Sequence, residues 1–283
     1  MIKSNKNSFI FILILILASG YLFFVGIPDF QKDFSLKFDG ANDYVSLPQI
    51  NAGEQFTLEG WFYPTSTSIP WMTLFKDDWK GTNLGSFYLH PVLIGNQVDL
   101  SWWWGEKDML YLHNLNINTW YYFVFTADGE NTTMYAITDY QSWKKSVQAV
   151  PSFNNELKIG ETDDGTFYKG QIDDIKIYNR ALSEEEIKEH YQKIYKNETG
   201  LLGFWNFNEG KKKIVYDNSD NENDGIISGP VYVSSIDKMV SHEGKIKKTP
   251  KELFSTNEYS PQSLVNKTSS WFKNLINPEI YGR

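Results

Sequence analysis

The sequence predicts an all-β fold, with two antiparallel sheets packed face to face as a sandwich and one short helix. Segments of alternating apolar and polar residues recur from residue 33 to about 237, and they are rich in β-branched and aromatic side chains. Asp-Gly, Gly-Asn and Asn-Asp turn formers separate these segments. The hydrophobic content of 41% and aromatic content of 16% are enough for a large core.

Residues 1–28 precede the sandwich and are predicted to be a membrane anchor. Phe9 to Ile27 is a run of 19 residues without a charge, which as a helix would span roughly 28 Å, the hydrocarbon thickness of a bilayer. Lys3 and Lys6 before the run place the amino terminus in the cytoplasm and the remainder outside it. Small residues at 18–20 leave a second interpretation open, a cleaved signal peptide that would make the protein secreted.

Residues 33–237 are expected to form one sandwich domain. A capping box of Ser183 and Glu186 predicts a helix over residues 183–195, with Ile187, Tyr191 and Ile194 on one face. Apolar segments at 200–210 and 226–233 predict further strands of the same domain. Ten strands are expected before the helix, over residues 35–38, 44–47, 56–63, 72–76, 86–91, 97–104, 120–127, 133–138, 156–159 and 170–178.

Two segments carry a resemblance to a known family. They are Ser35-Leu-Lys-Phe-Asp-Gly-Ala-Asn-Asp-Tyr-Val-Ser-Leu-Pro48 and Gly170-Gln-Ile-Asp-Asp-Ile-Lys-Ile-Tyr-Asn-Arg-Ala-Leu-Ser-Glu-Glu-Glu-Ile187. Both resemble the first and closing strands of the laminin-G-like jelly roll, which concanavalin A-like lectins and glucanases share. The resemblance implies a jelly-roll sandwich that is either a binding module or an enzyme.

The residues disfavour an enzyme. Retaining glucanases of this fold place carboxylates on alternate residues of one strand, and the nearest match, Glu161-Thr-Asp163, lacks the second glutamate. The four histidines are scattered, and no zinc-helix, phosphate-loop or nucleophile-elbow motif is present. We therefore expect no catalytic residues, with a glycoside hydrolase as the less favoured alternative.

Charge and cysteine content narrow the cofactors and partners. The chain has no cysteine, which excludes disulfides, thiol nucleophiles and cysteine-ligated metals. Residues 28–237 carry 17 basic and 31 acidic side chains, a net charge of 17 − 31 = −14 that disfavours nucleic acid and suits divalent cations. The family resemblance implies a structural calcium held by Asp174, with Asp39 and Asp217 as further ligands, although these acids also fit ordinary turns and strand positions.

Aromatic residues supply a candidate ligand surface. In Trp102-Trp-Trp104, strand alternation sends Trp102 and Trp104 to one face and Trp103 to the other. Sugar rings stack on exposed indoles, so Trp102 and Trp104 are predicted as a carbohydrate platform, with Trp71 and Trp79 in nearby loops. The alternative is that these indoles belong to the core, as most aromatic residues of a sandwich do.

Residues 238–283 form a basic linker followed by a predicted amphipathic helix. Ser260-Pro261 is typical of a helix start. Three docking sites are open for this helix, namely the sandwich, the membrane surface and a partner protein, for which Trp271, Phe272 and Leu275 are the expected contacts.

These observations together predict a membrane-anchored, extracytoplasmic, non-enzymatic module for adhesion or for glycan or protein binding. The alternative is a structural accessory subunit of a larger membrane assembly. The single apolar segment and the apolar face of the tail support that alternative.

Overall fold

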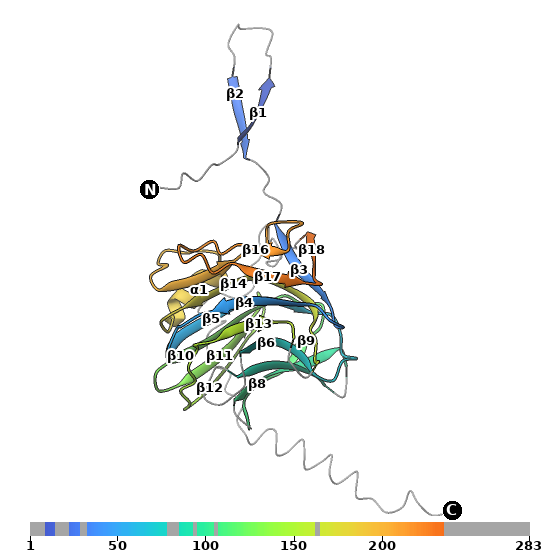
Figure 1. Ribbon diagram of the computed structural model, residues 1–283, viewed down its shortest axis with the longest axis vertical. Coiled ribbons are helices and arrows are strands. Elements are labelled where there is room, and N and C mark those ends of the chain that lie inside the picture. Colours follow the sequence, from blue (N-terminus) through green and yellow to red (C-terminus); the bar gives the residue numbers. More distant parts are fainter. Residues whose placement is uncertain are drawn as a thin grey trace, which may run out of the picture.

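The computed structural model describes residues 9–14, 23–28, 33–77, 85–92, 95–104, 107–161 and 165–234. It shows an all-β sandwich of two antiparallel sheets, with one helix across the outside of one of them (Figure 1). The predicted fold class is confirmed for this part of the chain.

The first sheet, sheet 1, contains both segments that carry the family resemblance. Its strand order is β12-β11-β10-β5-β14-β3-β18, and β15 also pairs with β14. β3 pairs with the first half of β14 and β15 with the second half, so strands from both ends of the described sandwich meet there. The strands are β3 (Phe34–Asp39), β5 (Gln55–Pro64), β10 (Tyr121–Asp128), β11 (Thr132–Ile137), β12 (Ser142–Val147), β14 (Lys169–Tyr178), β15 (Leu201–Trp205) and β18 (Val231–Ser234).

The second sheet, sheet 2, packs against sheet 1. Its strand order is β16-β17-β4-β13-β6-β7-β8-β9. The strands are β4 (Tyr44–Gln49), β6 (Met72–Asp77), β7 (Ser86–Pro91), β8 (Gln97–Trp104), β9 (Lys107–Asn116), β13 (Glu156–Ile159), β16 (Ile214–Val215) and β17 (Gly225–Ser228).

Aromatic side chains from both sheets form the centre of the core. Phe123 and Phe125 point inward from β10, and the ring centroid of Phe125 lies 4.7 Å from that of Phe87 on β7 and 4.8 Å from that of Trp102 on β8. The ring centroids of Phe75 on β6 and Phe123 are 5.5 Å apart. All five rings are buried, so this contact between the sheets contributes much of the hydrophobic stabilisation.

Helix α1 (Glu184–Tyr191) covers the outer face of sheet 1. Ser183 and Glu186 form the predicted capping box, and Ile187 and Tyr191 pack on the sheet as expected. The helix ends earlier than predicted, and Ile194 lies beyond it, 40% exposed. The Tyr191 ring stacks on Trp61 of β5 with centroids 5.6 Å apart.

A bulge interrupts β14 directly after Asp173, at Asp174 and Ile175. The register with β5 shifts between Asp173 and Lys176, and Asp174 adopts a left-handed backbone with φ of 50°. The bulge comes close to Gly60 on β5, where an added Cβ would lie 2.4 Å from Ile175 Cδ1. The bulge therefore requires a glycine at position 60 and a residue that tolerates positive φ, such as aspartate, at position 174.

The amino-terminal segment differs from its prediction. The predicted helix from Phe9 to Ile27 is not shown, and the described residues of this segment form two antiparallel strands, β1 (Phe9–Ile14) and β2 (Phe23–Pro28). The run is rich in isoleucine and phenylalanine, which favour strands as strongly as they favour apolar surroundings, so hydrophobicity alone does not specify a helix. Within the described residues, no helix is long and apolar enough to cross a bilayer. The predicted tail helix, with Trp271, Phe272 and Leu275, lies outside the described residues.

Candidate functional site

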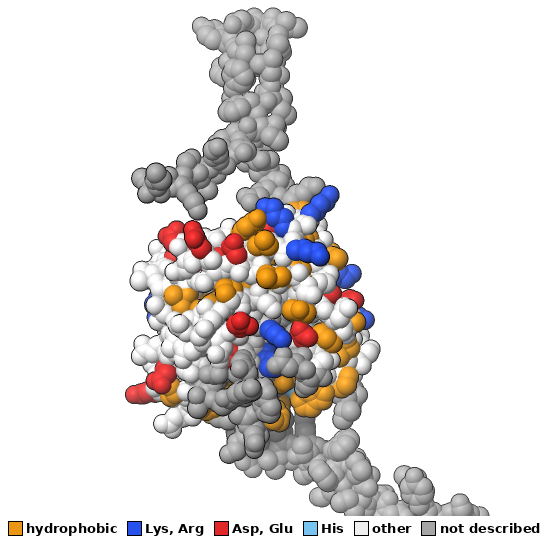
Figure 2. Space-filling view, in the orientation of Figure 1, with side chains coloured by type: hydrophobic (Ala, Val, Ile, Leu, Met, Phe, Trp, Pro, Cys, Tyr) orange, Lys and Arg blue, Asp and Glu red, His pale blue; other side chains and the backbone are white. Residues whose placement is uncertain are grey.

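The outer faces of the two sheets differ in what covers them. On sheet 1, helix α1 buries Trp61, Tyr122 and Tyr135. On sheet 2, Trp71 before β6 and outward positions of β7 to β9 carry aromatic, histidine and aspartate side chains that are partly or fully exposed, together with the buried Ser101. We call this surface the aromatic–histidine face, and it consists of Trp71, Tyr88, His90, Asp99, Ser101, Trp103, Tyr111 and His113. Figure 2 shows hydrophobic side chains gathered where Figure 1 labels β9.

Strand alternation and register create this face. Val98, Leu100 and Trp102 of β8 point into the core, so Asp99, Ser101 and Trp103 point outward. The remaining outward residues come from the neighbouring strands. Tyr88 and Tyr111 flank Ser101 in the register, and His90 lies opposite Asp99.

Trp71 stands at one end of the face, just before β6. Its side chain is 43% exposed. Its ring lies edge-on to His90, with centroids 4.1 Å apart, and edge-on to Tyr88 at 5.8 Å. The contacts fix the orientation of the indole while leaving a large part of its surface in solvent.

A second aromatic step lies on β9. The rings of Tyr111 and His113 stack with centroids 5.5 Å apart and an angle of 1° between their planes. His113 Nδ1 lies 2.8 Å from Asp99 Oδ2, and the other carboxylate oxygen accepts a hydrogen bond from the backbone N–H of Asn114. Asp99 thereby fixes the imidazole, which is half exposed.

The arrangement is suited to binding more than to hydrolysis. Serine, histidine and aspartate are all present, but Ser101 Oγ contacts His90 Nε2 at 2.5 Å, whereas Asp99 contacts His113. Ser101 is also fully buried, and a serine nucleophile must be reachable by its substrate. What remains accessible is a row of rings with polar groups between them, which can stack on and hydrogen-bond to a flat ligand.

The predicted platform of Trp102 and Trp104 needs correction. Trp102 is fully buried against Phe125, because its side of β8 faces the core, so it has no surface to offer a sugar. Trp104 is half-buried and stacks on Trp102 with centroids 5.8 Å apart. Trp103, on the opposite side, belongs to the aromatic–histidine face, and Trp79 lies outside the described residues.

The sequence did not predict the remaining members of this face. Tyr111 and His113 could have been found, because they alternate with Leu110 and Leu112 in an apolar–polar pattern of period two. Two consecutive polar residues, His113 and Asn114, interrupt the alternation before Leu115 and obscure the strand. In the structure Asn114 has a positive φ and the register with β8 shifts there. The pairing of His90 with Ser101 depends on register, which no local pattern specifies.

The predicted calcium ligands Asp39, Asp174 and Asp217 are not brought together. Asp39 lies opposite Lys169 on β14, five residues from Asp174 and thus about 16 Å away along the strand. Both carboxylate oxygens of Asp217 already accept hydrogen bonds, from the N–H groups of Ser219 and Asn223 and the Ser219 hydroxyl in its own loop and from the N–H of Phe204 on β15. Within the described residues, no group of three acidic or histidine side chains is placed to hold a metal.

Asp39 does have a second carboxylate beside it. Its backbone N–H donates to Asp43 Oδ2 at 2.8 Å, while its own Oδ1 accepts from the Ala41 N–H. Burial, and then the charge of Asp39, raises the pKa of the Asp43 carboxyl. This turn therefore holds two acids close together, and calcium remains a prediction.

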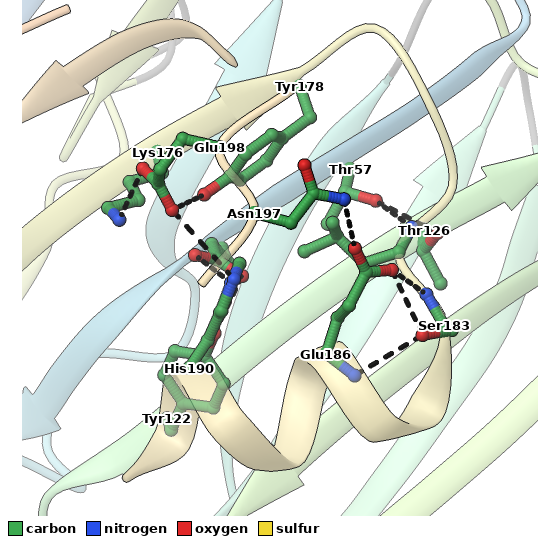
Figure 3. A network of polar contacts seen from close by, with 12 residues as sticks. Thr57, Tyr122, Thr126, Lys176, Tyr178, Ser183, Glu186, His190, Asn197 and Glu198 are labelled. Atoms are coloured by element: carbon green, nitrogen blue, oxygen red, sulfur yellow. Dashed lines mark hydrogen bonds and ion pairs between the residues drawn. The ribbon is translucent and has the colours of Figure 1, made fainter. Parts of the chain in front are cut away.

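A second polar cluster lies between α1 and sheet 1 (Figure 3). His190 Nδ1 lies 3.0 Å from Glu59 Oε1, and Tyr122 donates to Glu59 Oε2 at 2.6 Å. Lys176 Nζ lies 3.0 Å from Glu198 Oε2. Burial, followed by the charge of Glu59, raises the pKa of Tyr122 well above its usual value. Glu59, His190 and Lys176 are buried and Glu198 is partly exposed, so these contacts hold the helix on the sheet.

Comparison with known families agrees with this architecture. Residues 39–188 match the family model for the concanavalin A-like lectin/glucanases superfamily. The chain belongs to this superfamily. A comparison with curated proteins found no match.

Several solved structures from different organisms are similar to this chain. A Bacteroides ovatus protein provisionally described as carbohydrate-binding is 13% identical, with a TM-score of 0.54 over 75% of this chain and 62% of that one. A Limulus polyphemus pentraxin is 15% identical, with a TM-score of 0.43 over 54% and 78% of the two chains. Domains LG4-5 of mouse laminin α1 are 12% identical, with a TM-score of 0.38 over 59% and 48%. At 13% identity the likeness to the Bacteroides ovatus protein concerns the fold alone, and this chain spans less than two thirds of that protein's length.

Proposed function

We propose that this chain is a non-enzymatic binding module that recognises carbohydrate through the aromatic–histidine face. The observation that carries the proposal is the exposed indole of Trp71, held edge-on by His90 at one end of a row that continues to the stacked rings of Tyr111 and His113. Sugars present C–H faces that pack on such rings, and their hydroxyls find donors and acceptors in Asp99 and His113.

A protein ligand is the second candidate. Half-buried tyrosine and tryptophan side chains are also enriched in protein–protein interfaces, so adhesion to another protein would use the same surface. The two candidates differ in their ligand and not in the residues that contact it.

We also propose that the module is held outside a membrane by its apolar segment, Phe9 to Ile27. An isolated two-stranded hairpin leaves unpaired backbone groups on both outer edges, so within a bilayer this segment would have to become helical. Resistance of the full chain to alkaline extraction from membranes, with the sandwich accessible to added protease, supports the proposal. Full release by alkali would count against it.

The experiment for the ligand is a glycan-array screen of the full chain. Trp71→Ala is expected to abolish binding to the glycans that the unmodified protein selects. The matched control is Tyr140→Ala, which removes an exposed aromatic ring between β11 and β12, away from this face. If the unmodified chain binds no glycan above background, the proposal of a carbohydrate ligand is wrong and a protein ligand remains the candidate.

A further inference from the structure

One edge of the sandwich combines lysines with exposed aliphatic side chains. Lys211, Lys212 and Lys213 are consecutive and exposed. Ile226 is 63% exposed, Val231 58% and Ile214 44%. We call these six residues the basic–aliphatic edge. Grouped on one surface, aliphatic side chains beside cations are typical of an amphipathic surface that binds anionic membranes.

The topology gathers these residues at one place. Ile214 and Ile226 lie directly opposite each other in β16 and β17, at the end of sheet 2. Val231 begins β18, the terminal strand of sheet 1. Between the two sheet edges runs an open groove of about 450 Å³, lined by residues 210–213 and 227–232.

The basic–aliphatic edge adjoins the point where the chain enters the sandwich. Two ring carbons of Phe34, the first residue of β3, lie 3.5 and 3.7 Å from where a Cβ on Gly210 would be, and Gly210 directly precedes Lys211. The Phe34 N–H donates to Asn208 Oδ1 at 2.7 Å, which ties the two segments together.

The acidic groups close to this edge already have partners. Glu209 accepts from the Tyr216 N–H and from the Tyr232 hydroxyl. Asp33 lies 4.0 Å from Lys193 Nζ. Lys212 Nζ contacts the hydroxyl and ring of Tyr216. In Figure 2 the Lys and Arg side chains gather at the upper right and the Asp and Glu side chains at the upper left, so positive charge dominates one side of this end.

The short connection between the apolar segment and β3 indicates which partner this edge can meet. Only residues 29–33 separate Pro28 from Phe34, and six extended Cα steps reach no more than about 20 Å. If the apolar segment lies in a bilayer, as the proposed function states, this end of the sandwich faces that bilayer at close range.

We propose that the basic–aliphatic edge docks on the surface of the anchoring membrane, with its lysines on anionic lipid headgroups and its aliphatic side chains at the headgroup–acyl boundary. This inference rests on the proposed membrane attachment. Docking would fix the orientation of the sandwich relative to the membrane and restrict its motion on the short connection.

The absence of cysteine makes the test direct, because one engineered cysteine gives a single labelling site. The full chain with Ser228→Cys, in the groove, carries a fluorophore and is reconstituted in vesicles that contain nitroxide-labelled lipid headgroups. The matched control label is at Ser146→Cys on β12, the strand at the opposite end of sheet 1 from β18. The vesicles are phosphatidylcholine, alone or mixed with phosphatidylglycerol.

With phosphatidylglycerol, quenching at position 228 is expected to exceed that at position 146 several-fold. High salt, neutral vesicles or the triple change Lys211→Gln, Lys212→Gln and Lys213→Gln should remove the difference, because exposed charges are screened by salt. The three lysines are exposed, so the variant should keep the melting temperature of the unmodified protein.

Flotation of the same samples separates the two proposals. A chain that floats with the vesicles but is quenched equally at both positions overturns the docking and leaves the attachment standing. A chain that fails to float overturns both. Quenching at 228 that depends on the number of chains per vesicle and ignores lipid charge would assign the groove to a second copy and also overturn the docking.

Discussion

At the scale of single residues, two tryptophans thirty-one positions apart have opposite roles. Trp102 is fully buried and packs on Phe125, whereas Trp71 is 43% exposed. Trp102→Ala should therefore lower the free energy of unfolding by about 3–5 kcal/mol, the usual result of emptying a core site. Trp71→Ala should change it by no more than about 1 kcal/mol.

Urea unfolding followed by circular dichroism measures both values. Equal losses for the two variants would show that Trp71 is part of the core. The aromatic–histidine face would then lose its main accessible ring.

The tryptophan triplet also shows what sequence could and could not predict about the site. Alternation correctly separated Trp102 and Trp104 from Trp103. The same strand also indicates which side faces the core, because Val98 and Leu100 share the side of Trp102 whereas Asp99 and Ser101 share that of Trp103. The triplet taken without these neighbours leads to the wrong surface, and the pairing of β8 with β7 and β9 adds Phe87 and Leu110 to the side of Trp102.

The contribution of Glu186 to stability is predicted to depend on pH. Hydrogen bonds from Arg180 lower the pKa of this carboxyl to about 2. A lowered pKa contributes stability that is complete above the ordinary glutamate pKa and is lost as the pH falls toward 2.

The comparison is with Glu186→Gln, which keeps an amide at the third helical position for the capping box. The unmodified protein should melt at a higher temperature than the variant above about pH 5, and the gap should close as the pH approaches about 2. Melting temperatures measured across this range test the prediction. A gap that is constant or that widens in acid would contradict the role of the Arg180 pair.

At the scale of elements, the bulge in β14 depends on the backbone of Asp174. Its φ of 50° is tolerated by aspartate and free of strain for glycine, but it is unfavourable for a β-branched residue. Asp174→Val should cost about 1–2 kcal/mol of stability, whereas Asp174→Gly should cost little. Chemical denaturation distinguishes the two, and a valine variant as stable as the glycine variant would argue against a strained bulge.

The strands that could be predicted from the sequence are those with a clear alternation of apolar and polar residues. Strands with clear alternation, such as Gln97–Trp104 and Glu156–Ile159, were predicted with their observed bounds. The edge strand β12, Ser-Trp-Lys-Lys-Ser-Val, is not predicted because Lys145 lies between Trp143 and Val147 on its only partly apolar side. The amino-terminal run was predicted as a helix from hydrophobicity and length, features that do not exclude the strands β1 and β2.

At the scale of the whole molecule, the calcium prediction concerns the stability of the folded sandwich. A cation that binds only the folded state raises the melting temperature, so chelation should lower it if the acidic turn of Asp39 and Asp43 holds an ion. Asp39→Asn should abolish the calcium effect, while Asp220→Asn, an exposed control, should not. Identical midpoints with calcium and with chelator would remove the calcium proposal.

The two proposed surfaces lie on different parts of the molecule. The aromatic–histidine face occupies the β6–β9 end of sheet 2, and the basic–aliphatic edge lies at the β16–β17 end, with β18 of sheet 1 beside it. Since β4 and β13 separate β17 from β6 within sheet 2, one surface can meet the membrane while the other remains open to a ligand. This separation is what a tethered binding module requires.

The central claim is that the aromatic–histidine face binds carbohydrate, and titration calorimetry with a glycan selected on the array tests it most directly. The unmodified chain and Tyr140→Ala should bind with the same dissociation constant. Trp71→Ala should weaken binding at least about tenfold, corresponding to a loss of about 1.4 kcal/mol. If Trp71→Ala binds as tightly as the unmodified chain, the glycan is held elsewhere and the claim is wrong.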